Sequence, residues 1–249
     1  NLLKVAGLRG IGPALPEVMR ELASAQVNVR KSAWTALGMI GRPENVADFI
    51  EKMASSKEPE WAAQAVAEVA KRDGARDKSM AAIVSAYRSG LGGVPFRISL
   101  LKIMGEVGGA KALELLSDAV QSPEAELRKA AASTLGLWPD NEALGVIAAL
   151  FHGEKDPAIR LIALASATNL SATAGQLPQG EIVSMAKALY QASRDQREKD
   201  QAMAVIARVT DEEAAVFFDA LAVSEPQRKS QAEATSKRIR EALARVIRV

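Results

Sequence analysis

Cysteine and histidine, the residues most used as metal ligands and nucleophile–base pairs, are nearly missing from this chain. Cysteine is absent and His152 is the single histidine. Ordinary zinc sites take most of their three or four ligands from Cys and His, so one histidine cannot build one. We therefore expect no metal ion and no cofactor, and we interpret His152 as a polar residue at the end of a helix.

Acidic residues that could act as a catalytic pair occur at Asp140/Glu142 and at Glu212/Glu213. Two-carboxylate catalysis needs a cleft and one carboxyl group with a raised pKa. The sequence indicates neither. Both pairs lie near expected helix N-termini, where the helix dipole favours negative charge. We interpret them as helix-start residues and expect a non-catalytic protein.

The glycine-rich stretch SGLGGVP, residues 89–95, is the closest approach to a phosphate-binding loop. It lacks the G-x-x-x-x-G-K-[ST] pattern, and no strand is expected before it. We interpret it as a linker between helices.

Arginine recurs near the start of similar helical segments. The four positions are Arg30, Arg97, Arg128 and Arg160. In the first three segments a glycine follows eight residues later, at Gly38, Gly105 and Gly136, and the fourth has Thr168 there. Together with Gly41 and Gly108, we expect Gly38 and Gly105 to lie where these helices end, because glycine tolerates positive φ at a helix C-terminus.

A second helix is expected after each of these segments, with apolar residues at i, i+3, i+4 and i+7, which fall on one helix face. These apolar quartets start at residues 15, 46, 80, 113, 144, 182 and 214. The chain therefore repeats with a period in the low thirties, except where residues 168–180 (TNLSATAGQLPQG) lengthen one repeat. Insertions of this kind sometimes form a binding face, although a tolerated surface loop is the simpler interpretation.

The repeated pattern resembles the bacterial HEAT-like repeats of the HEAT-repeat (armadillo-like) family. The resemblance is carried by VRKSAWTALGMIGRPENV, residues 29–46, and by DPAIRLIALASA, residues 156–167. Repeats three and seven match poorly, with Gln64 and Glu198 at the arginine position. The resemblance implies an all-α, right-handed α-solenoid of about seven two-helix repeats. It also implies that the four arginines form a structural ladder of hydrogen bonds between successive repeats, rather than a ligand site.

We expect residues 1–249 to form a single repeat domain with a capping helix in residues 226–249. A terminal repeat needs a polar outer face, and the basic residues of this last segment supply one. The chain starts inside a helical pattern whose first repeat lacks such a cap. We therefore expect it to be a piece of a longer protein.

Composition restricts the partners. Lys and Arg total 32 against 30 Asp and Glu, without the basic excess typical of nucleic-acid binders. No run of 18 apolar residues is present, so no membrane span is expected, and nothing indicates a small-molecule ligand. No targeting signal is visible, which leaves both cytoplasmic and periplasmic locations open.

The remaining prediction is a scaffold that binds a protein, a peptide or a neighbouring domain of its own chain on the concave face, which the second helices line in this family. Outward positions on the middle second helices are apolar, and we place the site at Leu115, Val146 and Leu150. The competing interpretation is lateral packing between adjacent helices. Two enzyme-linked alternatives, a HEAT-like DNA glycosylase and a bilin-lyase-like subunit, stay open, although no basic groove or pigment pocket is indicated.

Overall fold

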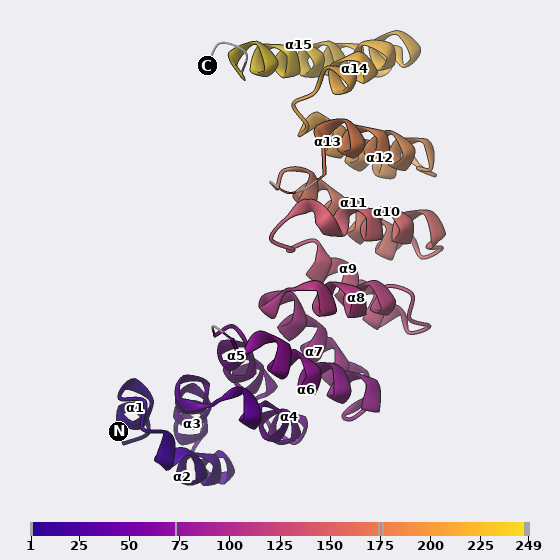
Figure 1. Cartoon of the computed structure of the whole chain (residues 1–249). Helices are drawn as coiled ribbons and strands as arrows, with labels where there is room; N and C mark the ends of the chain where they lie inside the picture. Colours follow the sequence, from indigo (N-terminus) through magenta and orange to yellow (C-terminus); the bar gives the residue numbers. More distant parts are fainter. Residues whose placement is uncertain (1, 73, 174, 176, 247–249) are drawn as a thin grey trace. The chain divides into compact units, whose positions relative to one another are not determined.

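The structure, a computed structural model, describes residues 2–72, 74–173, 175 and 177–246, and these form helices joined by turns, with no strand among them (Figure 1). Contacts group the chain into two compact units, Asn1–Ala131 and Ala132–Val249, with the boundary inside α9 (Ala125–Leu135). The predicted all-α class is confirmed. The single domain over residues 1–249 and the right-handed superhelix stay predictions.

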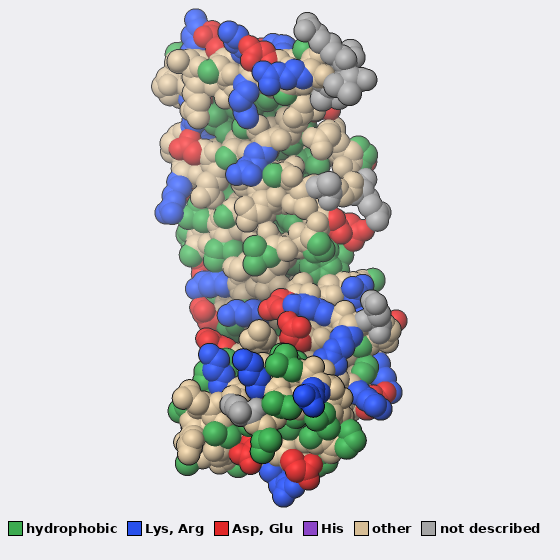
Figure 2. All heavy atoms as spheres, turned by 90° about the vertical axis from the view of Figure 1, so that its left-hand side faces the viewer, with side chains coloured by type: hydrophobic (Ala, Val, Ile, Leu, Met, Phe, Trp, Pro, Cys, Tyr) green, Lys and Arg blue, Asp and Glu red, His purple; other side chains and the backbone are tan. Residues whose placement is uncertain are grey.

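The first unit consists of helix pairs stacked in two layers. The first helices, α1, α3, α5 and α7, pack successively on one another, the second helices α4, α6 and α8 form the other layer, and α2 packs on α3. In chain order the helices are α1 Leu2–Leu8, α2 Leu15–Arg20, α3 Val27–Ile40, α4 Val46–Ala54, α5 Pro59–Ala70, α6 Arg76–Ser89, α7 Gly93–Val107 and α8 Ala110–Ala119. The α1 helix leaves Leu2 and Leu8 exposed, and hydrophobic side chains gather toward the bottom of Figure 2, where the N-terminal helices lie.

The second unit repeats this arrangement. The first helices α11 and α13 pack together, and the second helices α10, α12 and α14 form the neighbouring layer. The helices after α9 are α10 Leu144–Gly153, α11 Pro157–Ser171, α12 Gln179–Gln191, α13 Gln196–Ala207, α14 Glu212–Ser224 and α15 Lys229–Val246. The described residues thus contain seven helix pairs and a final helix, as the sequence period predicted.

The apolar quartets form the core of both units. Most members of five of the seven quartets are buried on second helices, as at Val46, Phe49, Ile50 and Met53 on α4, whereas in the first quartet only Val18 is buried. Neighbouring helix pairs cover apolar faces that one pair alone would leave in water.

The prediction that all four glycines lie where helices end is wrong for two of them. Gly38 and Gly105 lie inside α3 and α7, not at their ends. A Cβ atom on Gly38 would lie 3.2 Å from the Cα atom of Ala65 on α5, so Gly38 permits close packing of two first helices. Gly41 and Gly108 do follow the helix ends, and Gly108 has φ +69°.

The last helix, α15, packs along α14 and buries Ile239, while most of the rest of its surface is polar. Its basic residues face solvent or bind neighbouring helices. Arg238, for example, donates to the carbonyl oxygen of Ala207 at the end of α13. Residues 247–249 of the predicted capping segment lie outside the described residues.

Candidate functional site

The structure corrects the predicted docking strip at two of its three residues. Leu115 on α8 and Leu150 on α10 are only 3% and 4% exposed, and Val146 is partly exposed. Second helices contact their neighbours, α8 with α6 and α10 with α12. The two leucines therefore do not form an exposed apolar strip, and Leu150→Asp would test folding rather than binding.

Leu115 nevertheless lies at the bottom of a groove between α6 and α8. The groove encloses about 530 Å³ within the first unit. Ala81 and Val84 from α6 line it opposite Leu115, and Ser85 adds a hydroxyl group at its wall. This volume falls in the range of protein ligand pockets.

Charged side chains form the rim of this groove. Arg88 from α6 and Lys111 and Glu114 from α8 are exposed, and none of the three forms an ion pair with another described residue. Their summed charge is +1. The groove thus combines an apolar floor with charged groups whose hydrogen-bonding capacity is unused among the described residues.

The first arginine of the predicted ladder, Arg30, links two successive repeats. Its guanidinium group donates to the Glu58 carboxylate at the start of α5, and also to the carbonyl oxygens of Ser24 (2.8 Å) and Ala25 (3.1 Å). The hydrogen bond from Arg30 is the main reason why the pKa of Glu58 lies below its usual value. Arg30 therefore holds the turn before its own helix and the start of the next first helix.

Arg160 makes the most buried version of this link. Its Nε and Nη2 atoms lie 2.6 and 2.8 Å from the carboxylate oxygens of Glu198, and both side chains are almost fully buried. It also donates to the carbonyl oxygens of Phe151 and Ala192, and its guanidinium group lies 3.8 Å from the centre of the Phe151 ring.

The other two ladder arginines, Arg97 and Arg128, also contact the turn regions or the next repeat. Arg97 lies over the Tyr87 ring and has Glu124 at 3.6 Å, across to the next repeat. Arg128 donates to the carbonyl oxygens of Ser122 and Pro123 in the turn before its own helix. In Arg30, Arg97 and Arg160 the side chain thus reaches a glutamate of the following repeat.

Those glutamates were missed in the sequence. Glu58 directly precedes α5, Glu124 directly precedes α9, and Glu198 is the third residue of α13, so their spacing from the arginine varies. The available signal was an acidic residue near the start of the next first helix. In the sequence pattern, Glu198 stands out only because it occupies the position at which other repeats have arginine. Arg228, one of the basic residues expected on the polar outer face of the last segment, is instead buried, and it pairs with Asp200 and Glu225.

The inserted segment is shorter than predicted and is held from the preceding repeat. Residues 168–171 continue α11, and residues 179–180 begin α12. The buried Asn141 side chain accepts a hydrogen bond from the Leu177 backbone N–H (3.1 Å) and donates to the Leu177 carbonyl oxygen (3.3 Å). These contacts favour a structural role for the segment.

We expect Asn141→Ala to lower the free energy of unfolding by about 1–3 kcal/mol, because it leaves backbone groups of Leu177 without partners. Amide hydrogen exchange at Leu177 should accelerate more than exchange in α13. Asn169→Ala on the exposed surface of α11 is the matched control. Unchanged protection at Leu177 in Asn141→Ala would show that other contacts hold the segment.

His152 lies in the last turn of α10, where its exposed ring meets the Phe151 ring edge-on at 6.0 Å between ring centres. Within the described ranges, no three His, Asp or Glu side chains are grouped so that they could hold a metal ion. Of the helices that are described, none has the length and apolar character needed to cross a membrane.

Comparison with known proteins gives likeness of fold only. The sequence matches no protein family and no curated protein. Among solved structures it is similar to an engineered protein from a structural genomics consortium, with 18% identity and a TM-score of 0.37 over 91% of this chain and 96% of that one. It is also similar to the archaeal HEAT-like repeats protein from Thermococcus onnurineus NA1, with 14% identity and a TM-score of 0.38 over 82% of this chain and 92% of that one.

Proposed function

We propose that this protein is a non-catalytic interaction scaffold, which binds a segment of another protein, or of a neighbouring domain, in the groove between α6 and α8. The observation that carries the proposal is the groove itself, where an apolar floor at Val84 and Leu115 meets three charged side chains with no ion-pair partner among the described residues. Functional surfaces of repeat proteins are commonly formed by side chains from successive repeats.

The chemistry of the groove selects the kind of segment. Apolar side chains spaced at i and i+3 or i+4 on a helix would reach Ala81, Val84 and Leu115. Arg88 and Lys111 outweigh Glu114 by one positive charge, so acidic residues beside the apolar ones are favoured.

We expect a displayed library of amphipathic helical peptides to yield binders with paired apolar residues and flanking acids. Ala81→Glu/Ser85→Glu should reduce their affinity by roughly tenfold or more, because it adds bulk and negative charge to the groove wall. Both residues are exposed, so the substitutions should leave the fold intact. Affinity is measured by fluorescence anisotropy of a labelled peptide.

The matched control is Ser230→Glu/Ala234→Glu, an exposed pair with the same spacing on α15. It should leave peptide affinity unchanged. Equal affinity of the peptides for the groove variant and for the wild type would show that the binding site lies outside this groove. Failure to select any binder against the wild-type chain would contradict the proposed function.

A further inference from the structure

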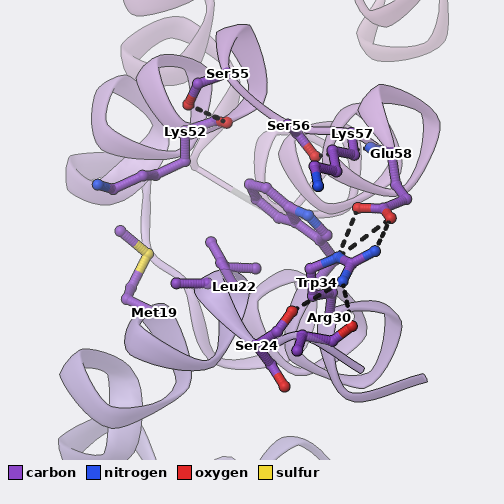
Figure 3. Close-up of a pocket in the computed structure, with 12 residues that line it drawn as sticks. Met19, Leu22, Ser24, Arg30, Trp34, Lys52, Ser55, Ser56, Lys57 and Glu58 are labelled. Atoms are coloured by element: carbon purple, nitrogen blue, oxygen red, sulfur yellow. Dashed lines mark hydrogen bonds and ion pairs between the residues drawn. The ribbon is translucent and has the colours of Figure 1, made fainter. Parts of the chain in front are cut away.

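A second cavity lies in the first unit between the end of the first helix pair and the start of the next two first helices. It encloses about 530 Å³ and is lined from η2 (Glu21–Ala23), the start of α3 and the turn between α4 and α5 (Figure 3). It shares no lining residue with the groove between α6 and α8.

The apolar part of this cavity consists of side chains that later repeats bury. Met19 and Leu22 remain partly exposed, whereas the residues at the same quartet positions in the next repeat, Ile50 and Met53, are 2% and 1% exposed. The Trp34 ring, itself almost fully buried, lies in the middle of the labelled residues in Figure 3. The cavity therefore presents apolar surface that a ligand would remove from water.

Arg30 and Glu58 form one wall, but they satisfy each other. Arg30 uses its donors on the Glu58 carboxylate and on two backbone carbonyl groups, as Figure 3 shows. Glu58 is the single acidic side chain in the lining, and its carboxylate is occupied by Arg30. This wall consequently offers no free carboxylate to a cation.

Several hydrogen-bond donors in the lining remain unused. Lys52 and Lys57 have no ion-pair partner among the residues that the structure describes, and the Trp34 ring N–H has no acceptor there. The Ser24 and Ser56 hydroxyl oxygens accept backbone N–H groups, from Gln26 and from Glu58, and this leaves their O–H groups to donate. An anionic acceptor matches this set of donors.

We propose that this cavity binds a monocarboxylate with an apolar body. The carboxylate would lie toward Lys52 and Lys57, and the apolar body against Met19, Leu22 and Trp34. A free carboxylic acid and the C-terminal carboxylate of a peptide ending in an apolar residue share this chemistry.

The indole N–H signal of Trp34 in an NMR spectrum reports on this cavity directly, and Trp34→Phe identifies it among the three tryptophan signals. We expect octanoate to shift this signal saturably, and octanol and octylamine to leave it unchanged at the same concentrations. Lys52→Glu/Lys57→Glu should weaken octanoate binding about tenfold or more, because both charges near the carboxylate are reversed.

The control variant is Lys4→Glu/Lys102→Glu, which makes the same change of net charge at exposed lysines outside the cavity. It should bind octanoate as the wild type does. A parallel titration with an acetylated peptide ending in leucine, as free acid and as amide, distinguishes the two sources. Response to the free-acid peptide alone assigns the site to a chain terminus, and response to octanoate alone assigns it to a small acid.

Equal shifts from octanoate and octanol would overturn the proposal, because recognition would then rest on the apolar surface alone. Absence of a shift with octanoate and with the free-acid peptide would also overturn it. Neither result bears on peptide binding between α6 and α8, which is tested separately.

Discussion

Replacing Glu198 with alanine is expected to lower the free energy of unfolding by about 3–5 kcal/mol, because it leaves the buried guanidinium group of Arg160 without its counter-charge. The two side chains are 1% and 3% exposed and meet through two hydrogen bonds. Glu198 also accepts the backbone N–H of Arg194, which loses its partner in the variant. Urea unfolding followed by circular dichroism measures the loss.

The matched control is Glu124→Ala, because Glu124 is the exposed counterpart of Glu198. Its side chain is 42% exposed and lies 3.6 Å from Arg97, so we expect a loss of no more than about 1 kcal/mol. The double variant Arg160→Met/Glu198→Leu should recover most of the stability, since it removes both charges and fills their volume with apolar atoms. Similar losses for Glu198→Ala and Glu124→Ala would show that burial does not set the strength of the ladder.

The Arg160–Glu198 pair should also make the free energy of unfolding fall at acid pH. The hydrogen bond from Arg160 is the main cause that lowers the pKa of Glu198 in the folded protein below the ordinary value of a glutamate side chain. The stabilisation is therefore complete above about pH 4.5 and is lost as the pH falls through the folded pKa. The wild type should lose stability over this range faster than Glu198→Gln, in which position 198 no longer titrates.

The helices and their period could be predicted from local pattern, because burial of one helix face requires apolar residues at helical spacing. The quartet that begins at Val46 illustrates this, since its positions alone identify the buried face of α4. The acceptors of the arginines could not be predicted in this way. Arg30 and Arg160 meet glutamates 28 and 38 residues later, and the inserted segment changes the offset without changing the contact.

The candidate sites depended on the distance between helices, which no local pattern determines. Leu115 and Leu150 both occupy outward positions on second helices, and the sequence pattern therefore predicted both as docking residues. In the structure Leu115 borders an open groove, whereas Leu150 belongs to no cavity that we describe. The cavity beside Trp34 was missed for the same reason, since Met19 and Leu22 carry the pattern of buried core residues.

The glycine that lies eight residues after the ladder arginine is explained by close packing between successive first helices. Gly38 faces Ala65 on the next first helix, and Gly136 faces Ser166 on α11. A Cβ atom on Gly136 would lie 2.7 Å from the Cβ atom and 2.9 Å from the Cα atom of Ser166. The backbone of Gly136 has no positive φ, so lack of space is the reason for glycine here.

We expect Gly136→Ala to lower the free energy of unfolding by about 1–3 kcal/mol, because the backbone of α11 must shift to admit the methyl group. Gly145→Ala on α10 is the control, since a Cβ atom there would meet nothing within 4 Å. That control should gain about 0.5–1 kcal/mol, because alanine favours the helix more than glycine does.

Ser166→Gly tests whether the contact itself is responsible. It removes the side-chain part of the clash but leaves the Cα atom of residue 166 in place, so it should rescue Gly136→Ala only in part. A double-mutant cycle over the two positions should therefore give a coupling energy of roughly 0.5–3 kcal/mol. A coupling near zero would mean that Gly136 is not held by Ser166. The recurring glycine would then reflect helix termination, as the sequence pattern alone had indicated, and not the approach of one first helix to the next.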